Sequence, residues 1–498
     1  MELKTKILNW DAGFPVAMLN KKTASSIGVN TGDRITLKTY SSHPHEVSTI
    51  TNTTTKLVRT GEVAVSSELR EQLGLKRGQK VEIKLSPIPK SLNLIKKKLN
   101  KNRLSQKEID EIISDVVNNS LYESEIALFI SAMYKQGMTM KETIYLIKSI
   151  LKYGNKLDLK DKSMRSKLIV DKHGIGGIPG NRTTPIIVSI CAAAGLIMPK
   201  SSSRAITSAA GTADVIETFA HVEFSMQDLK KIIKKTGACM VWGGALEMVP
   251  ADSKIIRVEK MLKIDPEAQL LASIMSKKLA VGSKYIVIDI PYGKTAKVNK
   301  EGALRLKTKF EYLGKYFRRK LKVILTKADG PRGDYVGPAL ELIDILNILD
   351  PNKEGPKDLE EKSLLLAGQL LEMTKKAKKG EGINLAREIL ESGEAFKKFK
   401  QIIETQGGRI IKIKPGKFKK NILAKKSGRI YEIDNKKISL LARIAGCPTD
   451  KFAGLHIPFN TKDLVKKGEK ILTIYAESKS RLNEAVKFYK KEKPLKIK

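Results

Sequence analysis

Two segments in the middle of the chain have the composition of an anion-binding site. The first, DKHGIGGIPGNRTT over residues 171–184, combines glycines with Lys172 and ends in Thr183 and Thr184. Glycine lets backbone N–H groups come close to an anion, and a helix that starts after the segment would point its N-terminal dipole at the same place. The spacing matches neither a Walker loop nor a dinucleotide fingerprint. A phosphate cradle and a glycine-rich turn with a surface lysine are therefore both open for this segment alone.

The second segment, SSSRAITSAAGT over residues 201–212, favours phosphate binding. It holds six hydroxyl groups and Arg204 among small side chains, and it also lies between an expected strand and an expected helix. Hydroxyl groups and arginine suit phosphate and ribose, whereas the alternative is a packing loop in which Ser and Thr act as caps. Because two such segments follow successive strands of one expected sheet, a phosphate site is the better interpretation.

A third stretch, residues 265–278, reads as a helix with polar groups on one face. Asp265 precedes a proline and is expected to be the N-cap, which is a sufficient structural reason for its presence. Ser273 and Lys277 are four residues apart, so they share a helix face that could line a cleft.

The pattern around these segments alternates strand and helix over residues 164–405. Such alternation predicts an α/β domain with a mostly parallel sheet, and ligands of these sheets bind at the carboxyl ends of the strands. The sequence therefore predicts that the glycine-rich and hydroxyl-rich segments lie at one edge of the sheet.

The flanking parts of the chain predict three further domains. Residues 1–86 contain an internal repeat of short helix, glycine turn and alternating strand, which predicts a small pseudo-symmetric β barrel. Residues 90–163 read as amphipathic helices, one of them with a capping box at Ser105. Residues 406–498 become strand-rich, at RIIKIKPG, SGRIYEID and EKILTIYAES. The expected architecture is a multidomain α/β protein with an N-terminal barrel, a helical domain, a central α/β domain and a C-terminal α+β domain.

The composition favours an enzyme over a binding module. The 498 residues include 93 Lys and Arg against 53 Asp and Glu, a formal net charge of +40. The lysines are spread along the chain among acidic residues, which indicates a solvated surface rather than a nucleic-acid-binding arm. Three scattered cysteines and five histidines favour neither a disulfide framework nor a metal site, and they suit the cytoplasm. The longest nearly apolar run, Ile186 to Met198, is too short to span a bilayer, so no membrane partner is expected.

The three motifs together resemble those of the thymidine and pyrimidine-nucleoside phosphorylase family. The matching stretches are KHGIGGIPGNRTT, PKSSSRAITSAAGTAD and LLASIMSKKLAVGSKYIVID. The resemblance implies a helical domain hinged to an α/β domain and followed by an α+β domain. It implies phosphate binding by Lys172, Thr184 and Ser202, although Gly174 stands where the family has a phosphate-binding serine. It also implies recognition of the base by Ser273 and Lys277.

The departures from that family fit its archaeal AMP phosphorylase branch, which the chain resembles over its full length. Val258 stands where the nucleoside enzymes carry an arginine for the pyrimidine, and the N-terminal repeat is additional. The branch cleaves a nucleoside 5′-monophosphate with inorganic phosphate, giving free base and ribose 1,5-bisphosphate. The resemblance makes Asp265 the proton donor. Its nucleotide ligands map onto Gly177, Ser203, Arg204, Ala205, Ile206, Thr207, Ser208, Thr212, Ser273 and Lys297, with Lys294 close to the last of them.

These assignments imply that phosphate displaces the base directly at ribose C1′. Asp265 would protonate the leaving base, provided that burial keeps its carboxyl group protonated, and Arg204 would help to hold the 5′-phosphate. His173 is a candidate for shaping the base pocket, and a structural role is equally open. No cofactor is expected besides phosphate as co-substrate, and no nucleic-acid partner; the family implies a homo-oligomer, a dimer or larger.

Two other enzymes stay open at this point. One is a pyrimidine nucleoside phosphorylase, and the other is a phosphoribosyltransferase of the anthranilate type, which would need magnesium. The preference among AMP, CMP and UMP is also open.

Overall fold

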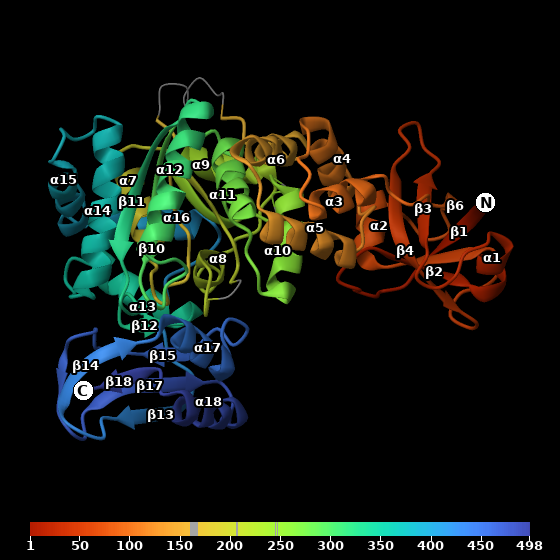
Figure 1. Ribbon diagram of the computed structural model, residues 1–498. Coiled ribbons are helices and arrows are strands. Elements are labelled where there is room, and N and C mark those ends of the chain that lie inside the picture. Colours follow the sequence, from red (N-terminus) through yellow and green to blue (C-terminus); the bar gives the residue numbers. More distant parts are fainter. Residues whose placement is uncertain (160–167, 206–207, 245, 247) are drawn as a thin grey trace. The chain divides into compact units, whose positions relative to one another are not determined.

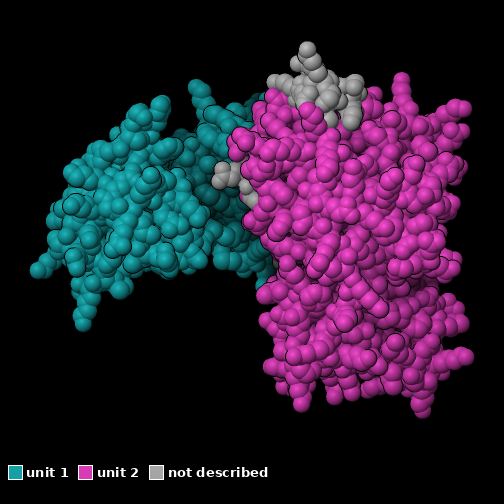
Figure 2. Space-filling view, turned by 180° about the vertical axis from the view of Figure 1, so that it is seen from behind, with its two compact units in different colours: residues 1–153, 250–269 teal, residues 154–249, 270–498 magenta. Residues whose placement is uncertain are grey.

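The computed structural model describes residues 1–159, 168–205, 208–244, 246 and 248–498. Two units account for these residues: residues 1–153 with 250–269, and residues 154–249 with 270–498 (Figure 2). This division is coarser than the four domains expected from the sequence, whose boundaries stay a prediction.

The first unit begins with a closed six-stranded barrel, which confirms the expected fold of the N-terminal repeat (Figure 1). In each half a short helix ends at a glycine with positive φ, Gly28 or Gly74, and a strand follows. Alternate apolar side chains of the strands fill the interior. The strands run β1-β5-β2-β4-β3-β6 around the barrel. The elements are β1 (Glu2–Ile7), β2 (Val16–Asn20), α1 (Lys21–Ser26), β3 (Arg34–Thr39), β4 (Glu46–Thr54), β5 (Glu62–Val65), α2 (Ser67–Leu73) and β6 (Lys80–Leu85).

The rest of the first unit is a helical bundle, as expected. The predicted capping box is present: the Ser105 backbone N–H donates to Glu108 Oε2 over 2.8 Å, and the Ser105 hydroxyl accepts from the Glu108 backbone. A buried ion pair between Lys98 and Glu142, 2.8 Å long, joins two of the helices. The helices are α3 (Ser91–Leu99), α4 (Gln106–Val117), α5 (Glu123–Gln136), α6 (Met140–Lys152) and α10 (Pro250–Leu262).

Five parallel strands form the centre of the second unit, and this confirms the expected α/β arrangement. They make one sheet of order β11-β10-β7 and a pair β8-β9, and an isolated parallel bridge between Ile169 and Ile197, just before β7 and β8, connects the two. The other neighbouring strands also pair in parallel. The strands are β7 (Val170–Gly174), β8 (Met198–Ser202), β9 (Ala238–Trp242), β10 (Tyr285–Tyr292) and β11 (Lys320–Lys327).

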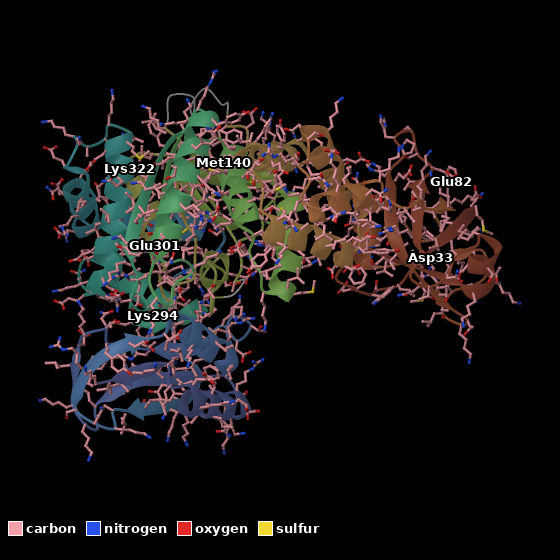
Figure 3. The ribbon with its side chains drawn as sticks, viewed as in Figure 1. Asp33, Glu82, Met140, Lys294, Glu301 and Lys322 are labelled. Atoms are coloured by element: carbon pink, nitrogen blue, oxygen red, sulfur yellow. The ribbon has the colours of Figure 1, made fainter. Side chains whose placement is uncertain are left out.

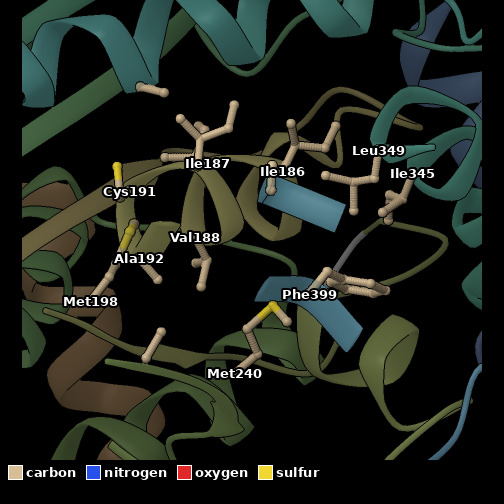
Figure 4. Close-up of a cluster of buried hydrophobic side chains, with 14 of the residues drawn as sticks. Ile186, Ile187, Val188, Cys191, Ala192, Met198, Met240, Ile345, Leu349 and Phe399 are labelled. Atoms are coloured by element: carbon tan, nitrogen blue, oxygen red, sulfur yellow. The ribbon is translucent and has the colours of Figure 1, made fainter. Parts of the chain in front are cut away.

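Helix α7 (Thr183–Ala193) is buried on nearly all sides at the core of this unit. Figure 4 shows Ile186, Ile187 and Val188 of this helix among the core side chains, together with Met240 and Phe399. The other helices are α8 (Thr212–Ile216), α9 (Met226–Thr236), α11 (Glu267–Ala280), α12 (Lys300–Tyr316), α13 (Pro338–Leu349), α14 (Lys357–Met373), α15 (Gly382–Glu391) and α16 (Glu394–Thr405). The boundary between the two units falls within α11, after Gln269. No helix in the described part of the chain is both long enough and apolar enough to span a bilayer.

The end of the chain folds as antiparallel strands with two helices around a core of its own, in blue in Figure 1. Two of the three strand-rich stretches predicted here contain strands, β14 and β17. The third, RIIKIKPG over residues 409–416, contains no strand, because its backbone instead bonds singly to Phe219 and Phe452. The elements are β12 (Tyr335–Val336), β13 (Phe418–Leu423), β14 (Gly428–Ile433), α17 (Asn435–Ala445), β15 (Gly454–His456), β16 (Leu464–Val465), β17 (Lys470–Ala476), α18 (Lys479–Glu492) and β18 (Leu495–Ile497).

Candidate functional site

Strand β7 carries the charged residues that the sequence suggested were part of a loop. Lys172 and His173 lie within the strand, and the loop begins only at Ile175, so the expected position of these two residues is corrected. Strand β10 pairs in parallel with β7, with Val287 opposite Lys172 and Ile288 opposite His173, and holds both residues in an extended backbone. Because successive residues of a strand point to opposite faces, Lys172 lies on one face of the sheet and Asp171 and His173 on the other.

The face with Lys172 holds two buried lysines and one buried aspartate. Lys172 Nζ donates to Thr183 Oγ1 over 2.7 Å at the start of α7. Lys362 of α14 pairs with Asp289 of β10 over 2.8 Å, and the Thr326 hydroxyl donates to the same carboxylate over 2.8 Å. Burial lowers the pKa of Lys172 to about 7, and the nearby charges of Lys362, Lys200 and Arg182 act in the same direction.

The opposite face repeats the same charge pattern. Asp171 is fully buried and pairs with Lys278 of α11 over 2.6 Å and with Lys200 of β8 over 3.6 Å. Burial, helped by the charge of Lys200, lowers the pKa of Lys278 to about 7. Burial and the neighbouring lysines also hold the pKa of His173 well below its usual value, so this imidazole is neutral.

The buried ends of the strands therefore carry more positive than negative charge. Four lysines, each at most 6% exposed, surround two aspartates that are fully buried. A buried charge without a partner is costly, so an excess of buried cations marks a place where an anionic ligand would be stabilised. Three buried polar atoms nearby lack a hydrogen-bond partner among the described residues: His173 Nδ1, Asn181 Oδ1 and Ser202 Oγ. Such atoms call for a further polar group, and a ligand would supply it.

The glycine-rich loop that follows β7 packs closely against two other strand-end loops. A Cβ atom at Gly180 would lie 2.2 Å from the carbonyl oxygen of Arg332, and one at Gly177 would lie 3.0 Å from the Cβ of Lys297. Both glycines also have positive φ, so their lack of a side chain is required here. Among the described residues, no side chain caps the start of α7, and Thr184 is buried in the first turn, so this helix end retains backbone N–H groups for an anion.

The hydroxyl-rich segment begins at the end of β8 and is held by a buried carboxylate. Asp214 accepts hydrogen bonds from the backbone N–H of Ala205 over 2.6 Å and of Gly211 over 2.7 Å. Thr212 accepts from Arg182 over 3.0 Å, and the Ser208 hydroxyl donates to a backbone carbonyl within the segment. Two of the predicted ligands, Ile206 and Thr207, lie outside the described residues, and Ser203 is exposed at the other end.

The guanidinium of Arg204 is held by acidic side chains in this structure. It donates to both carboxylate oxygens of Glu217 over 2.8 and 2.7 Å and to Glu223 over 2.9 Å, and it lies over the ring of Trp242. Arg204 accordingly holds the pKa of Glu217 at about 2. In this arrangement the side chain of Arg204 ties the segment to Glu217 and Glu223.

Helix α11 presents two predicted residues on one face. Lys277 Nζ donates to Ser273 Oγ over 2.8 Å, which confirms that the two side chains share a face. Asp265 differs from its expectation in two ways. The helix begins at Glu267, so Asp265 is not the residue that directly precedes it, and the side chain is exposed rather than buried because it lies on the connection between α10 and α11.

Known domain families cover most of the chain. Residues 92–154 match the helical bundle domain of the glycosyl transferase family, residues 166–396 match its a/b domain, and residues 429–496 match the pyrimidine nucleoside phosphorylase C-terminal domain. The fold resembles anthranilate phosphoribosyltransferase from Thermus thermophilus, with a TM-score of 0.51 at 18% identity. That match covers 63% of this chain and 99% of the other, and at this identity it shows the fold alone.

Relatives along the full length are much closer in sequence. The chain is 41% identical to AMP phosphorylase of Pyrococcus furiosus, and the alignment covers 100% of this chain and 98% of the relative. It is 40% identical to AMP phosphorylase of Methanococcoides burtonii, with 99% of this chain and 97% of the relative covered. The chain belongs to the AMP phosphorylase family. As a family member it is an enzyme of the glycosyltransferase type.

One difference from nucleoside enzymes, noted in the sequence, has a structural counterpart. Val258, which replaces their arginine, is buried in α10. The adjacent Arg257 points elsewhere, as expected: it donates to the carbonyl oxygen of Gly13 over 2.8 Å and pairs with Glu123 over 3.0 Å. Arg257 therefore joins the barrel to the helical bundle within the first unit.

The two lysines after β10 have different surroundings. Lys294, labelled in Figure 3, is 85% exposed and pairs with Glu432 of β14 over 3.1 Å. Lys297 lies beside Gly177 of the glycine-rich loop. Within the described part of the chain, Lys297 is therefore the lysine of this pair that lies against a loop of the predicted site.

The sequence analysis missed the buried charges that surround the candidate site. Asp171 and Asp289 each interrupt an apolar strand, and this signal could have been used. Lys362 carries no such signal, because it lies on a helix far along the chain and reaches the site only through the fold. Lys200, Lys278 and Asp214 belong to motifs that were singled out, but their pairing required the structure.

Proposed function

We propose that this member of the AMP phosphorylase family cleaves AMP with inorganic phosphate and releases adenine and ribose 1,5-bisphosphate. The observation that carries the proposal is the excess of buried lysine over aspartate at the ends of β7, β8 and β10. Both substrates are anions, and the product sugar carries two phosphoryl groups. A site with this charge is suited to such ligands and unsuited to a neutral nucleoside alone.

Phosphate in this proposal is bound by Lys172, Thr184 and Ser202. Lys172 supplies an ammonium group, the Ser202 hydroxyl is buried without a partner among the described residues, and Thr184 lies in the first turn of α7. The nucleotide is held by Gly177, by Thr212 and by the segment 203–208, and Ser273, Lys277 and Lys297 complete its site. His173, being neutral, contributes an uncharged surface next to the base.

The reaction is a direct displacement at C1′ of the ribose. A phosphate oxygen forms the new bond to C1′ while the bond between C1′ and the base breaks, and the electron pair of that bond goes to the base nitrogen. Positive charge builds on the ribose ring on the way, as in other glycosyl transfers, and the phosphate dianion stabilises it. Asp265 supplies the proton that the leaving adenine takes up.

The proposal includes no cofactor besides phosphate as co-substrate. A homo-oligomer, at least a dimer, is also part of it. The cysteines Cys191, Cys239 and Cys447 are free and buried, which suits the reducing cytoplasm that the sequence favoured.

The substrate itself provides the first test. Incubation with phosphate is expected to release adenine from AMP at a kcat/KM at least about a hundredfold higher than from adenosine, because two charge-assisted contacts to the 5′-phosphate are lost with adenosine. Chromatography of the base, with ribose 1,5-bisphosphate as the second product, measures both rates. A preference for adenosine, or for thymidine or uridine, would reject the proposal in favour of a nucleoside phosphorylase.

Above neutral pH, binding of an anion is expected to be coupled to the uptake of a proton by the protein. The pKa of Lys172 is about 7 without ligand, so at about pH 8 its amine is mostly neutral. A bound dianion favours the ammonium form and raises this pKa, so binding takes up a proton, and affinity falls as the pH rises from about 7 to about 9. Sulfate is the suitable probe because it exchanges no proton in this range.

Calorimetry of sulfate binding in buffers of different ionisation enthalpy measures this uptake. The same titration with Lys172→Met is expected to show the uptake reduced. Sulfate affinity that increases with pH, or binding without any exchange of protons, would contradict the role given to Lys172.

Replacing each of the two lysines after β10 by alanine is expected to change KM for AMP to a different extent. Lys297→Ala should raise KM for AMP about tenfold, the effect of losing one charge-assisted contact to the nucleotide. Lys294→Ala should leave KM within about twofold, because its exposed ion pair with Glu432 contributes little. Steady-state kinetics of the two variants side by side decide between them, and the reverse pattern would assign the nucleotide to Lys294.

A further inference from the structure

The loop over residues 293–299, which carries Lys297, is closed on itself and packed against the other strand ends. Its ends are joined by a hydrogen bond from the Gly293 N–H to the Val298 carbonyl oxygen over 3.1 Å. Ala296 at its centre is buried with Ile178 of the glycine-rich loop and Ala328, which follows β11. The position of this loop therefore decides where Lys297 lies relative to Gly177.

The C-terminal part of the chain provides the hydrogen bonds that hold this loop. Asn435, the first residue of α17, is fully buried. Its backbone N–H and its side-chain amide both donate to Thr295 Oγ1, over 3.2 and 3.0 Å, and the amide also lies 3.4 Å from the Ala328 carbonyl oxygen. A single asparagine thus bonds to the loops that follow both β10 and β11.

A second contact from the same region is present but weaker. Glu432 accepts from Lys294 over 3.1 Å and from Lys496 over 2.5 Å. Lys294 is 85% exposed, and an ion pair so open to solvent contributes little. The buried bonds of Asn435 matter more, because loss of the Thr295 oxygen leaves the Asn435 backbone N–H without its acceptor and the side-chain amide with only the longer contact to Ala328.

The C-terminal core also reaches the hydroxyl-rich segment. Ala209 of that segment is buried within the C-terminal hydrophobic cluster. Both segments that hold the nucleotide in the proposed function therefore rest on the same C-terminal core, through Ala209 and through Thr295.

We propose that Asn435 is a positioning residue for nucleotide binding, and that the C-terminal region thereby sets the affinity of the enzyme for AMP. Asn435 acts through Thr295 to keep the loop in the position that brings Lys297 to the nucleotide. This inference rests on the proposed function, because it takes AMP as the ligand of Lys297. Phosphate binding at Lys172 involves other elements and is independent of this contact.

The test uses a matched pair at Thr295 in the full-length protein. Thr295→Val keeps the shape but removes the oxygen that accepts both bonds, and it should raise KM for AMP about tenfold, while KM for phosphate changes by less than about twofold. Thr295→Ser keeps the oxygen and should restore KM for AMP. Asn435→Ala should resemble Thr295→Val, and if it does not fold, the pair at Thr295 still decides. Glu484→Gln, on the exposed face of α18, is the control for a change in the same region.

A double-mutant cycle with Lys297 separates positioning from general loss of stability. Once Lys297→Ala has removed the ammonium group, adding Thr295→Val should raise KM for AMP by less than about twofold more, because its effect passes through Lys297. The inference would be overturned if Thr295→Val raised KM for AMP by the same factor with and without Lys297. It would also be overturned if Thr295→Val raised KM for AMP and KM for phosphate equally. If Lys297→Ala alone leaves KM for AMP unchanged, the proposed nucleotide site fails; if it raises KM but Thr295→Val does not, only the positioning role fails.

Discussion

Asp265→Asn is expected to lower kcat for AMP phosphorolysis by about 10²- to 10⁴-fold while AMP still binds, because it removes the proton for the leaving base and leaves the shape of the side chain almost unchanged. The dissociation constant for AMP, measured without phosphate, should stay within about threefold of the normal value, because an amide and a carboxyl group fill the same space. Single-turnover release of adenine gives the chemical step directly.

A substrate that needs no proton provides the decisive control for Asp265. In a 5′-monophosphate whose purine is methylated at N7, the base already carries positive charge and leaves as a neutral molecule. Asp265→Asn should cleave this nucleotide at nearly the normal rate. Glu267→Gln, which changes another carboxylate at the start of α11, should leave AMP cleavage intact. Near-normal kcat with AMP in Asp265→Asn would remove Asp265 from the mechanism.

Lys172→Met is expected to lower kcat/KM for phosphate by about 10²- to 10³-fold, the usual loss when one preorganised donor to a reacting oxyanion is removed. The ammonium group is buried on the same face as the Lys362–Asp289 pair and bonds to Thr183, so no water can replace it easily. Binding of AMP alone should change much less. Initial rates over a range of phosphate concentrations measure the loss.

The same variant should be at least as stable as the unchanged protein when no ligand is present. Burial opposes the charged form of Lys172 more strongly than the charge of Asp289 favours it, so removing this ammonium group removes the cost of burying it, while Asp289 keeps its ion pair with Lys362. Thermal unfolding without and with phosphate measures this. Lower stability without ligand, together with unchanged stabilisation by phosphate, would make Lys172 a structural residue and contradict its role.

Periodicity and local signals were sufficient for the parts of the fold that are built from neighbouring residues. The barrel follows from the repeat around Gly28 and Gly74, and the capping box at Ser105 follows from its spacing to Glu108. The parallel sheet follows from the alternation of strand and helix. The stretch RIIKIKPG has the same alternation as a strand but contains none, since no neighbouring strand pairs with it among the described residues.

The candidate site was predicted from the sequence, whereas the charges around it could be described only from the structure. Lys172 was found from its glycine-rich surroundings, whereas its low pKa depends on Lys362 and Lys200, which reach it from other elements. Arg204 was expected to hold the 5′-phosphate, and its bonds to Glu217 and Glu223 depend on how the segment folds back. Distances between elements that are remote in sequence decide such partnerships, and periodicity carries no information about them.

A crystal structure with AMP and sulfate tests most directly whether the ends of β7 and β8 form one pocket for two anions. Sulfate takes the place of phosphate without reacting, so both ligands can stay bound. The account predicts sulfate within hydrogen-bonding distance of Lys172 and Ser202, and the 5′-phosphate of AMP along the segment 203–212. Ligands bound elsewhere, with both strand ends empty, would contradict it.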